Sequence, residues 1–140
     1  MVVLREDFSS ITSGNNTDSN GSNSGWNGND NFPTVNTAYQ AGGAVKIGKS
    51  KGTGSITSKS LDLSKAFTVS IDIKGWTTVE GKIKVTVGSQ SKEITYTETM
   101  SGSFGTYTVD FSAATASSTV EIATTAKRAF IDNVVITRHD

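Results

Sequence analysis

The sequence predicts an all-β protein, a jelly-roll β-sandwich of about nine antiparallel strands in two sheets. Ser, Thr, Asn and Gly are abundant, leucine is scarce and β-branched residues are plentiful. Short stretches of alternating apolar and polar residues follow one another at regular spacing, with turn residues between them. No stretch carries a convincing helical period. These three observations favour a sandwich of short strands.

The first expected strand covers roughly residues 2–8, after which the composition changes abruptly. Residues 9–40 are rich in Asn, Gly, Ser and Asp, with single aromatic residues among them. A connection of this length is unusual in a compact domain, so we expect it to be functional or poorly ordered. Because one strand cannot form a domain, it has to pair with strands beyond this loop. Residues 1–140 are therefore expected to form a single domain.

From residue 42 onward, strands are expected at short spacing. Gly88-Ser89 is expected to form a tight turn between two of them. The last strand is apolar on both faces, which predicts a central place in its sheet. The expected strands of this part are residues 44–49, 55–59, 67–74, 82–87, 92–99, 107–111, 118–123 and 129–137.

Composition and charge exclude several classes of function. The 13 Lys and Arg balance 13 Asp and Glu, so no basic excess indicates nucleic-acid binding, and strand lysines such as Lys46 are expected to face solvent. Cysteine is absent, which removes thiol chemistry, and no apolar run reaches the roughly 18 residues of a membrane span. The composition is typical of a secreted β module. No signal peptide is visible, and we expect a module cut from a larger exported protein.

Two carboxylates occupy positions that an alternating strand would give to apolar residues. Glu6 is expected on the strand face of Leu4, and Asp132 on the face of Phe130 and Val134. A buried ionised carboxylate is costly unless it is paired or binds a metal. If the first and last strands are neighbours, Glu6 and Asp132 can hold one cation, and calcium accepts such oxygen ligands. The alternatives are a carboxylate turned to solvent, or an ion pair with Arg5, Lys127 or Arg128.

The long loop carries residue types that recognise sugars. Trp26 and Phe32 can stack on sugar rings, while Asn29 and Asp30 can bind the hydroxyl groups, so these four are the candidate ligand-binding residues. Asn29 and Asp30 could also add ligands to the metal. The alternative is that the aromatic residues anchor the loop onto the sandwich, because ordering so long a loop costs conformational entropy.

The sequence gives no support to catalysis. The single histidine, His139, lies beside the C-terminus, where the chain is expected to fray. Without cysteine there is no Cys–His pair, and a frayed histidine cannot complete a Ser–His–Asp set. The glycine pairs lack the strand-to-helix context of a phosphate-binding loop. We therefore expect that the protein is not an enzyme.

Three stretches occur in an informative order. They are Leu4-Arg5-Glu6-Asp7-Phe8, residues 54–64 with the Leu61-Asp62-Leu63 segment, and residues 130–137 with Asp132 before an apolar run. Together they resemble the cleaved-adhesin and choice-of-anchor jelly-roll modules of secreted bacterial proteins, including gingipain adhesin domains. The resemblance implies a sandwich related in shape to carbohydrate-binding modules, often with a structural calcium. Glu6 and Asp132 match the acidic positions of the first and last strands of that family.

We therefore predict a non-catalytic, exported accessory module that binds a glycan or a cell-surface partner and carries a structural calcium at Glu6 and Asp132. It is expected to be monomeric, outside the cell or at its surface, with neither a nucleic-acid partner nor a membrane span. The alternative is a purely structural spacer or anchoring domain beside a catalytic domain.

Overall fold

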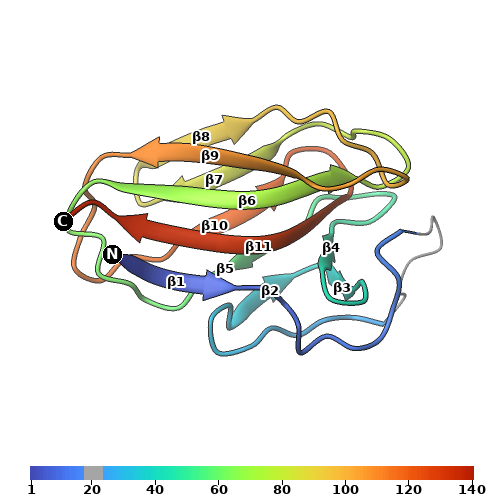
Figure 1. The fold of residues 1–140 in the computed structure, drawn as a ribbon, viewed down its shortest axis with the longest axis horizontal. Coiled ribbons are helices and arrows are strands. Elements are labelled where there is room, and N and C mark those ends of the chain that lie inside the picture. The colour runs from blue at the N-terminus through green and yellow to red at the C-terminus, as the bar shows by residue number, and fades with distance from the viewer. Residues whose placement is uncertain (18–23) are drawn as a thin grey trace.

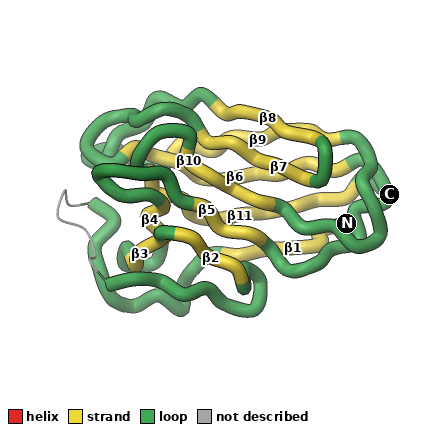
Figure 2. The backbone as a smooth tube through the Cα atoms, turned by 180° about the vertical axis from the view of Figure 1, so that it is seen from behind, coloured by secondary structure: helices red, strands yellow, loops and turns green. Residues whose placement is uncertain are grey.

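The computed structural model describes residues 1–17 and 24–140, which form two antiparallel sheets packed face to face. The described residues contain eleven strands and no helix, and therefore no helix that could cross a membrane. Figure 1 and Figure 2 show the sandwich from its two sides. The predicted jelly-roll β-sandwich is confirmed, with more strands than the nine or so expected.

One sheet, sheet A, has the order β3-β4-β11-β6-β9, and β1 pairs with the same edge of β11 as β4 does. The first and last strands are therefore neighbours, and the last strand is central, as predicted (Figure 1). The strands of sheet A are β1 (Val2–Glu6), β3 (Ala38–Gln40), β4 (Val45–Ile47), β6 (Phe67–Gly75), β9 (Gly105–Phe111) and β11 (Ala129–Arg138).

The other sheet, sheet B, has the order β2-β5-β10-β7-β8 (Figure 2). Its clearest sequence signal is in β7, where Ile83, Val85 and Val87 are buried and face the core. Gly88 takes a left-handed φ of 58° in the turn from β7 to β8, which glycine adopts at little cost. The strands of sheet B are β2 (Thr34–Asn36), β5 (Ser55–Thr57), β7 (Ile83–Val87), β8 (Gln90–Ile94) and β10 (Glu121–Thr124).

Residues 18–23 of the expected long loop lie outside the described residues, and the described part of that loop, 9–17 and 24–40, is more structured than a single loop. Its last residues form β2 and β3, and the amide of Trp26 donates to the Ala38 carbonyl at 2.9 Å. Trp26 is 8% exposed and Phe32 is fully buried, and both rings pack on Phe8 at centroid distances of 5.6 and 6.1 Å. Burial of these rings agrees with the anchoring alternative, in which they hold the loop against the sandwich.

A bulge in β11 changes which face its residues occupy. Pairing with β6 shifts between Asp132 and Val135, where Asn133 has a left-handed φ of 43°. Ile131 faces the core before the bulge and Val134 faces it afterwards. Phe130 and Asp132 therefore lie on the outer face of sheet A, and the expectation that Asp132 shares a face with Val134 is wrong.

Candidate functional site

The chain turns sharply at the end of β1, and Glu6 stabilises this turn. Phe8 adopts a left-handed φ of 53°, and its amide donates to Glu6 Oε2 at 2.9 Å. The Phe8 ring is fully buried in the core, which compensates for a conformation that is uncommon in a non-glycine residue. The turn therefore holds the Glu6 carboxylate at the surface end of the aromatic cluster.

Two asparagines from the loop donate to Glu6. Asn29 Nδ2 lies 2.7 Å and Asn31 Nδ2 3.1 Å from Glu6 Oε1. Asn29 is fixed at its other end, because Phe32 N donates to Asn29 Oδ1 at 2.8 Å. A carboxylate offers about four acceptor directions, so Glu6 keeps one free after accepting these two bonds and the one from Phe8. Glu6 and Asn29 thus form one hydrogen-bonded unit, which sequence reasoning named only as separate candidates.

These residues border an open polar depression at the end of β1, the β1-end depression, with a volume of about 480 Å³. Asp30 and Lys59 are exposed there, and neither side chain has a hydrogen bond or ion pair within residues 1–17 and 24–140. Both therefore remain available to a ligand. The depression is lined by Glu6, Asp7, Ser9, Ser10, Asn29, Asp30, Asn31 and Lys59.

Asp132 lies beside the depression at the β11 bulge. Burial is the main cause that raises the pKa of Asp132 to about 6. The negative charges of Asp72, Asp7 and Glu6 raise this pKa as well. The hydrogen bond from Asn133 N to Asp132 Oδ1, at 2.8 Å, acts in the opposite direction and lowers it. None of the ion pairs among the described residues includes Asp132. The expected alternative of a pair with Arg128 does not occur, because Arg128 pairs with Glu80.

The carboxylates around the end of β1 do not by themselves form a complete cation site. In the portion of the chain that the structure describes, no three acidic or histidine side chains converge on one metal position. Calcium also accepts backbone carbonyls, amide oxygens and water. Glu6, however, pairs with the core-facing Val134, whereas Asp132 lies on the outer face of sheet A, so the two carboxylates do not share one face. Their role as metal ligands remains a prediction.

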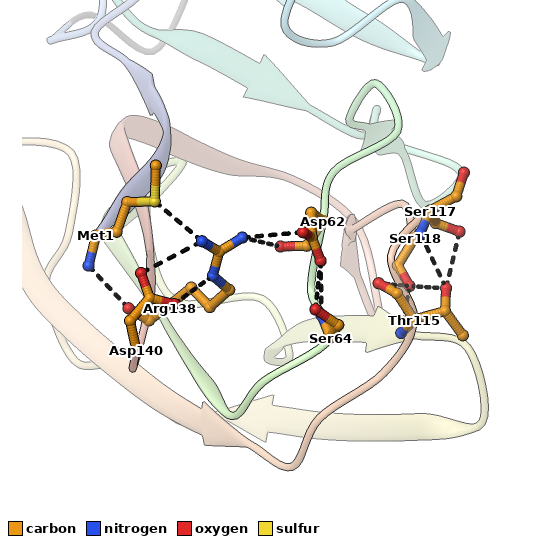
Figure 3. A network of polar contacts seen from close by, with 8 residues as sticks. All are labelled: Met1, Asp62, Ser64, Thr115, Ser117, Ser118, Arg138 and Asp140. Carbon is orange, nitrogen blue, oxygen red and sulfur yellow. Dashed lines mark hydrogen bonds and ion pairs between the residues drawn. The ribbon is translucent and has the colours of Figure 1, made fainter.

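His139 is held in place, which differs from the frayed terminus expected from the sequence. β11 extends to Arg138, whose side chain pairs with Asp62 at 3.3 Å and with Asp140, while the Met1 ammonium donates to the Arg138 carbonyl (Figure 3). This network bonds both termini to the sandwich, in contrast to the frayed end that the sequence predicts.

The fixed position of His139 does not create a catalytic site. Its Nε2 lies 2.7 Å from Thr68 Oγ1, and that hydroxyl donates its proton to Asp110 Oδ1 at 2.6 Å. The imidazole therefore donates to the hydroxyl and does not withdraw its proton, so Thr68 is not activated as a nucleophile.

Sequence reasoning missed a second cluster, on the outer face of sheet A. Lys46 and Lys74 were expected on polar strand faces, yet they are only 7% and 2% exposed. They lie among the buried rings of Trp76 and Phe130. No sequence signal indicated this burial, because a lysine between two apolar strand residues such as Val45 and Ile47 usually faces solvent, whereas all three residues are buried in the structure.

Comparisons with known proteins identify shared folds. No protein-family model matches the chain, and no curated protein sequence matches it significantly. The structure is similar to that of the unliganded CBM1 module of BiXyn10A, with a TM-score of 0.56, 18% identity and 99% of both chains covered. It is also similar to the family 35 carbohydrate-binding module of Abf62 from Cellvibrio japonicus, with a TM-score of 0.61 and 13% identity over 80% of this chain and 89% of that one.

A third similar structure contains a catalytic module as well. It is the CBM22-1–GH10 portion of xylanase 10B from Clostridium thermocellum, complexed with xylohexaose. The TM-score is 0.60 at 17% identity, and the match covers 99% of this chain and 29% of that chain. At identities this low, the similarity shows only that this protein shares the sandwich fold of these carbohydrate-binding modules.

Proposed function

We propose that this protein is a non-catalytic glycan-binding module whose β1-end depression contacts the sugar. The observation that carries this proposal is an open depression of about 480 Å³, lined by carboxylates, amides, hydroxyls and one lysine, on a sandwich with the fold of carbohydrate-binding modules. Those groups match the donors and acceptors of sugar hydroxyls. Loops on a rigid scaffold are the usual place for recognition.

Some residues of the β1-end depression hold its structure, and others are available to contact the sugar. Asn29 and Asn31 are engaged with Glu6, and the buried rings of Trp26 and Phe32 hold the loop that carries them. Asp30 accepts hydrogen bonds from sugar hydroxyls and Lys59 donates them, because their side chains are exposed and otherwise unengaged in the described structure. Trp26 and Phe32 therefore act by positioning the loop.

The direct test is Asp30→Ala against a panel of hexasaccharides of β-1,4-linked xylose, glucose, mannose and galactose. Calorimetric affinity for the sugar bound by the parent protein should fall about tenfold, the usual effect of losing a charged hydrogen-bond acceptor. The melting temperature should not change, because Asp30 is exposed. Glu93→Ala on β8, which removes another exposed carboxylate, is the matched control and should leave the affinity intact. Unchanged affinity in Asp30→Ala would remove the depression from the proposal.

A structural calcium at Glu6 and Asp132 is the second part of the proposal. Its support is the half-buried Asp132, which has like charges nearby and no basic partner in the described structure. Glu6 retains one acceptor direction toward such an ion. Calcium that binds only the native state should raise the melting temperature with its concentration. Asp132→Asn should abolish this increase, whereas equal melting temperatures of the parent protein in EDTA and in millimolar calcium would contradict the site.

The setting follows from the same proposal. We infer an exported, monomeric accessory module that acts outside the cell or at its surface, joined to a larger protein as the carbohydrate-binding module of xylanase 10B is joined to a catalytic module. Membership of the cleaved-adhesin type of module fits the order of the three motifs. A protein that binds no sugar in the panel above would instead serve as a spacer.

A further inference from the structure

A row of alternating rings and lysines crosses the outer face of sheet A. Tyr39 pairs with Lys46, Lys46 pairs with Phe130, and Phe130 pairs with Lys74, so the four side chains stand on one face of neighbouring strands. The row belongs to β3, β4, β11 and β6, on the face that Figure 1 turns toward the viewer. Lys46, Phe130 and Lys74 are only 7%, 0% and 2% exposed, so Tyr39 is the one member of the row that is appreciably exposed.

The two lysines of the row differ in how their charge is satisfied. Lys74 Nζ donates to the carbonyls of Met100 and Gly102, at 3.1 and 3.3 Å, and thereby fastens the loop after β8 to the sheet. Lys46 Nζ has no hydrogen bond or ion pair in the described structure and lies 4.7 Å from the ring centre of Tyr39 and 4.2 Å from that of Trp76. Lys46 thus has three unused donors.

The ammonium of Lys46 remains in contact with solvent. Among the described residues, the only fully buried side-chain polar atom without a hydrogen bond is the hydroxyl of Tyr96. The Lys46 ammonium also lacks a hydrogen bond, so it is not sealed within the protein although the side chain is only 7% exposed. The ammonium therefore lies at the boundary of the buried cluster, beside the half-buried Tyr39 ring.

A second cation, Arg128, lies near Lys46 but has its own counter-ion. The Arg128 guanidinium lies 5.2 Å from the Trp76 ring centre, so one ring is approached by two cations. Burial and the charge of Arg128 both lower the pKa of Lys46. Glu80 is the acid that pairs with Arg128, and both of its oxygens are engaged by that guanidinium at 3.1 Å. The charge of Lys46 is left without a counter-ion.

We propose that Lys46, with the half-buried Tyr39 ring beside it, binds the anionic group of an acidic polysaccharide. The carboxylate or sulfate of the sugar accepts hydrogen bonds from the Lys46 ammonium, and the sugar ring rests against Tyr39. This site is separate from the β1-end depression and does not depend on binding there. A single ammonium beside an aromatic ring suits one charged sugar, whereas a nucleic acid requires a wide basic surface that a chain of net charge zero does not supply.

The experiment measures calorimetric affinity for three probes: a hexamer of α-1,4-galacturonic acid, its methyl ester and dextran sulfate. The acid hexamer or dextran sulfate should bind, and the one that binds identifies the charged group as carboxylate or sulfate. The methyl ester, which has the same sugars without the charge, should bind at least about tenfold more weakly than the acid hexamer if the group is a carboxylate. Raising the salt concentration should weaken binding of the charged probe.

The diagnostic variant is Lys46→Met, which keeps an unbranched apolar stem and removes the charge. Affinity for the charged probe should fall about tenfold or more, while the melting temperature stays equal or rises because a partly desolvated cation has been removed. Lys92→Met removes an exposed lysine of β8 and should leave the affinity unchanged.

Four results would overturn the proposal. The first is full binding of the charged probe by Lys46→Met, and the second is no binding of either charged probe by the folded parent protein. The third, if only the acid hexamer binds, is equal binding of its methyl ester. The fourth, with single-stranded DNA as an additional probe, is tighter binding of the DNA than of the sugars. None of them would bear on the β1-end depression, whose neutral-sugar binding is tested separately with Asp30→Ala.

Discussion

At the scale of single residues, Trp26 illustrates how an aromatic ring in a glycine- and asparagine-rich loop can serve the fold. Its ring makes an edge-on contact with Phe8 and is 8% exposed. Truncation to alanine should therefore lower the free energy of unfolding by about 3–5 kcal/mol, as large core truncations do. Denaturant unfolding measures this cost. A stable Trp26→Ala variant that has lost glycan binding would show instead that the ring contacts the ligand.

Asp132 makes the stability of the calcium-free protein depend on pH in an unusual direction. Its pKa is raised from 3.8 to about 6 in the folded state, so between these values the folded state holds more protons than the unfolded one. Stability from this group is therefore present below about pH 4 and is lost as pH rises through about 6. Melting temperatures in EDTA should be lower at pH 7 than at pH 5, and Asp132→Asn should reduce the difference. A parent protein equally stable at both pH values would contradict the raised pKa.

At the scale of elements, the β11 bulge decides where Asp132 points. Asn133 tolerates the left-handed conformation that the bulge requires, and glycine would tolerate it better. Asn133→Val should lower the free energy of unfolding by about 1–3 kcal/mol, because a β-branched residue is strained there. Asn133→Gly should be nearly neutral. Thermal or denaturant unfolding distinguishes the pair, and equal stability of the valine and glycine variants would show that the bulge can relax.

Strands whose alternation is clear were predictable from the sequence. The pattern of β6 and β7 and the Gly88 turn predicted strand positions, and the apolar composition of β11 predicted its central place. The bulge was not predictable. Because β11 is apolar on both faces, its sequence does not reveal that the residues after the bulge point to the opposite face from the one that strict alternation would give them. The short strands β2 and β3 lay within a polar stretch that carries no period.

The sequence allowed individual residues of the candidate site to be predicted, but not the contacts between them. The notable carboxylate Glu6 and the amide of Asn29 were both identifiable, yet they are 23 residues apart and their contact depends on three buried rings. The burial of Lys46 could not be expected, since a lysine between two apolar strand residues usually faces solvent. Contacts of this kind arise from packing between distant segments, which local patterns do not encode.

At the scale of the whole molecule, the sandwich presents two distinct surfaces on one rigid frame. The β1-end depression offers acids, amides and a lysine at a loop, whereas on the outer face of sheet A the half-buried Tyr39 borders a largely buried cluster of rings and lysines. Arg138 and its partners bond both termini to the sandwich (Figure 3). Under the two proposals, the module would hold a polysaccharide at more than one point.

The central claim is that the β1-end depression binds a glycan, and backbone amide chemical shifts during a titration with the hexasaccharide panel test it most directly. One sugar should move the signals of Asp30, Asn31 and Lys59 in a saturable manner, while signals of the distant β7–β8 turn stay in place. A folded protein whose depression signals do not move with any sugar of the panel, or whose shifts lie only elsewhere, would contradict the claim.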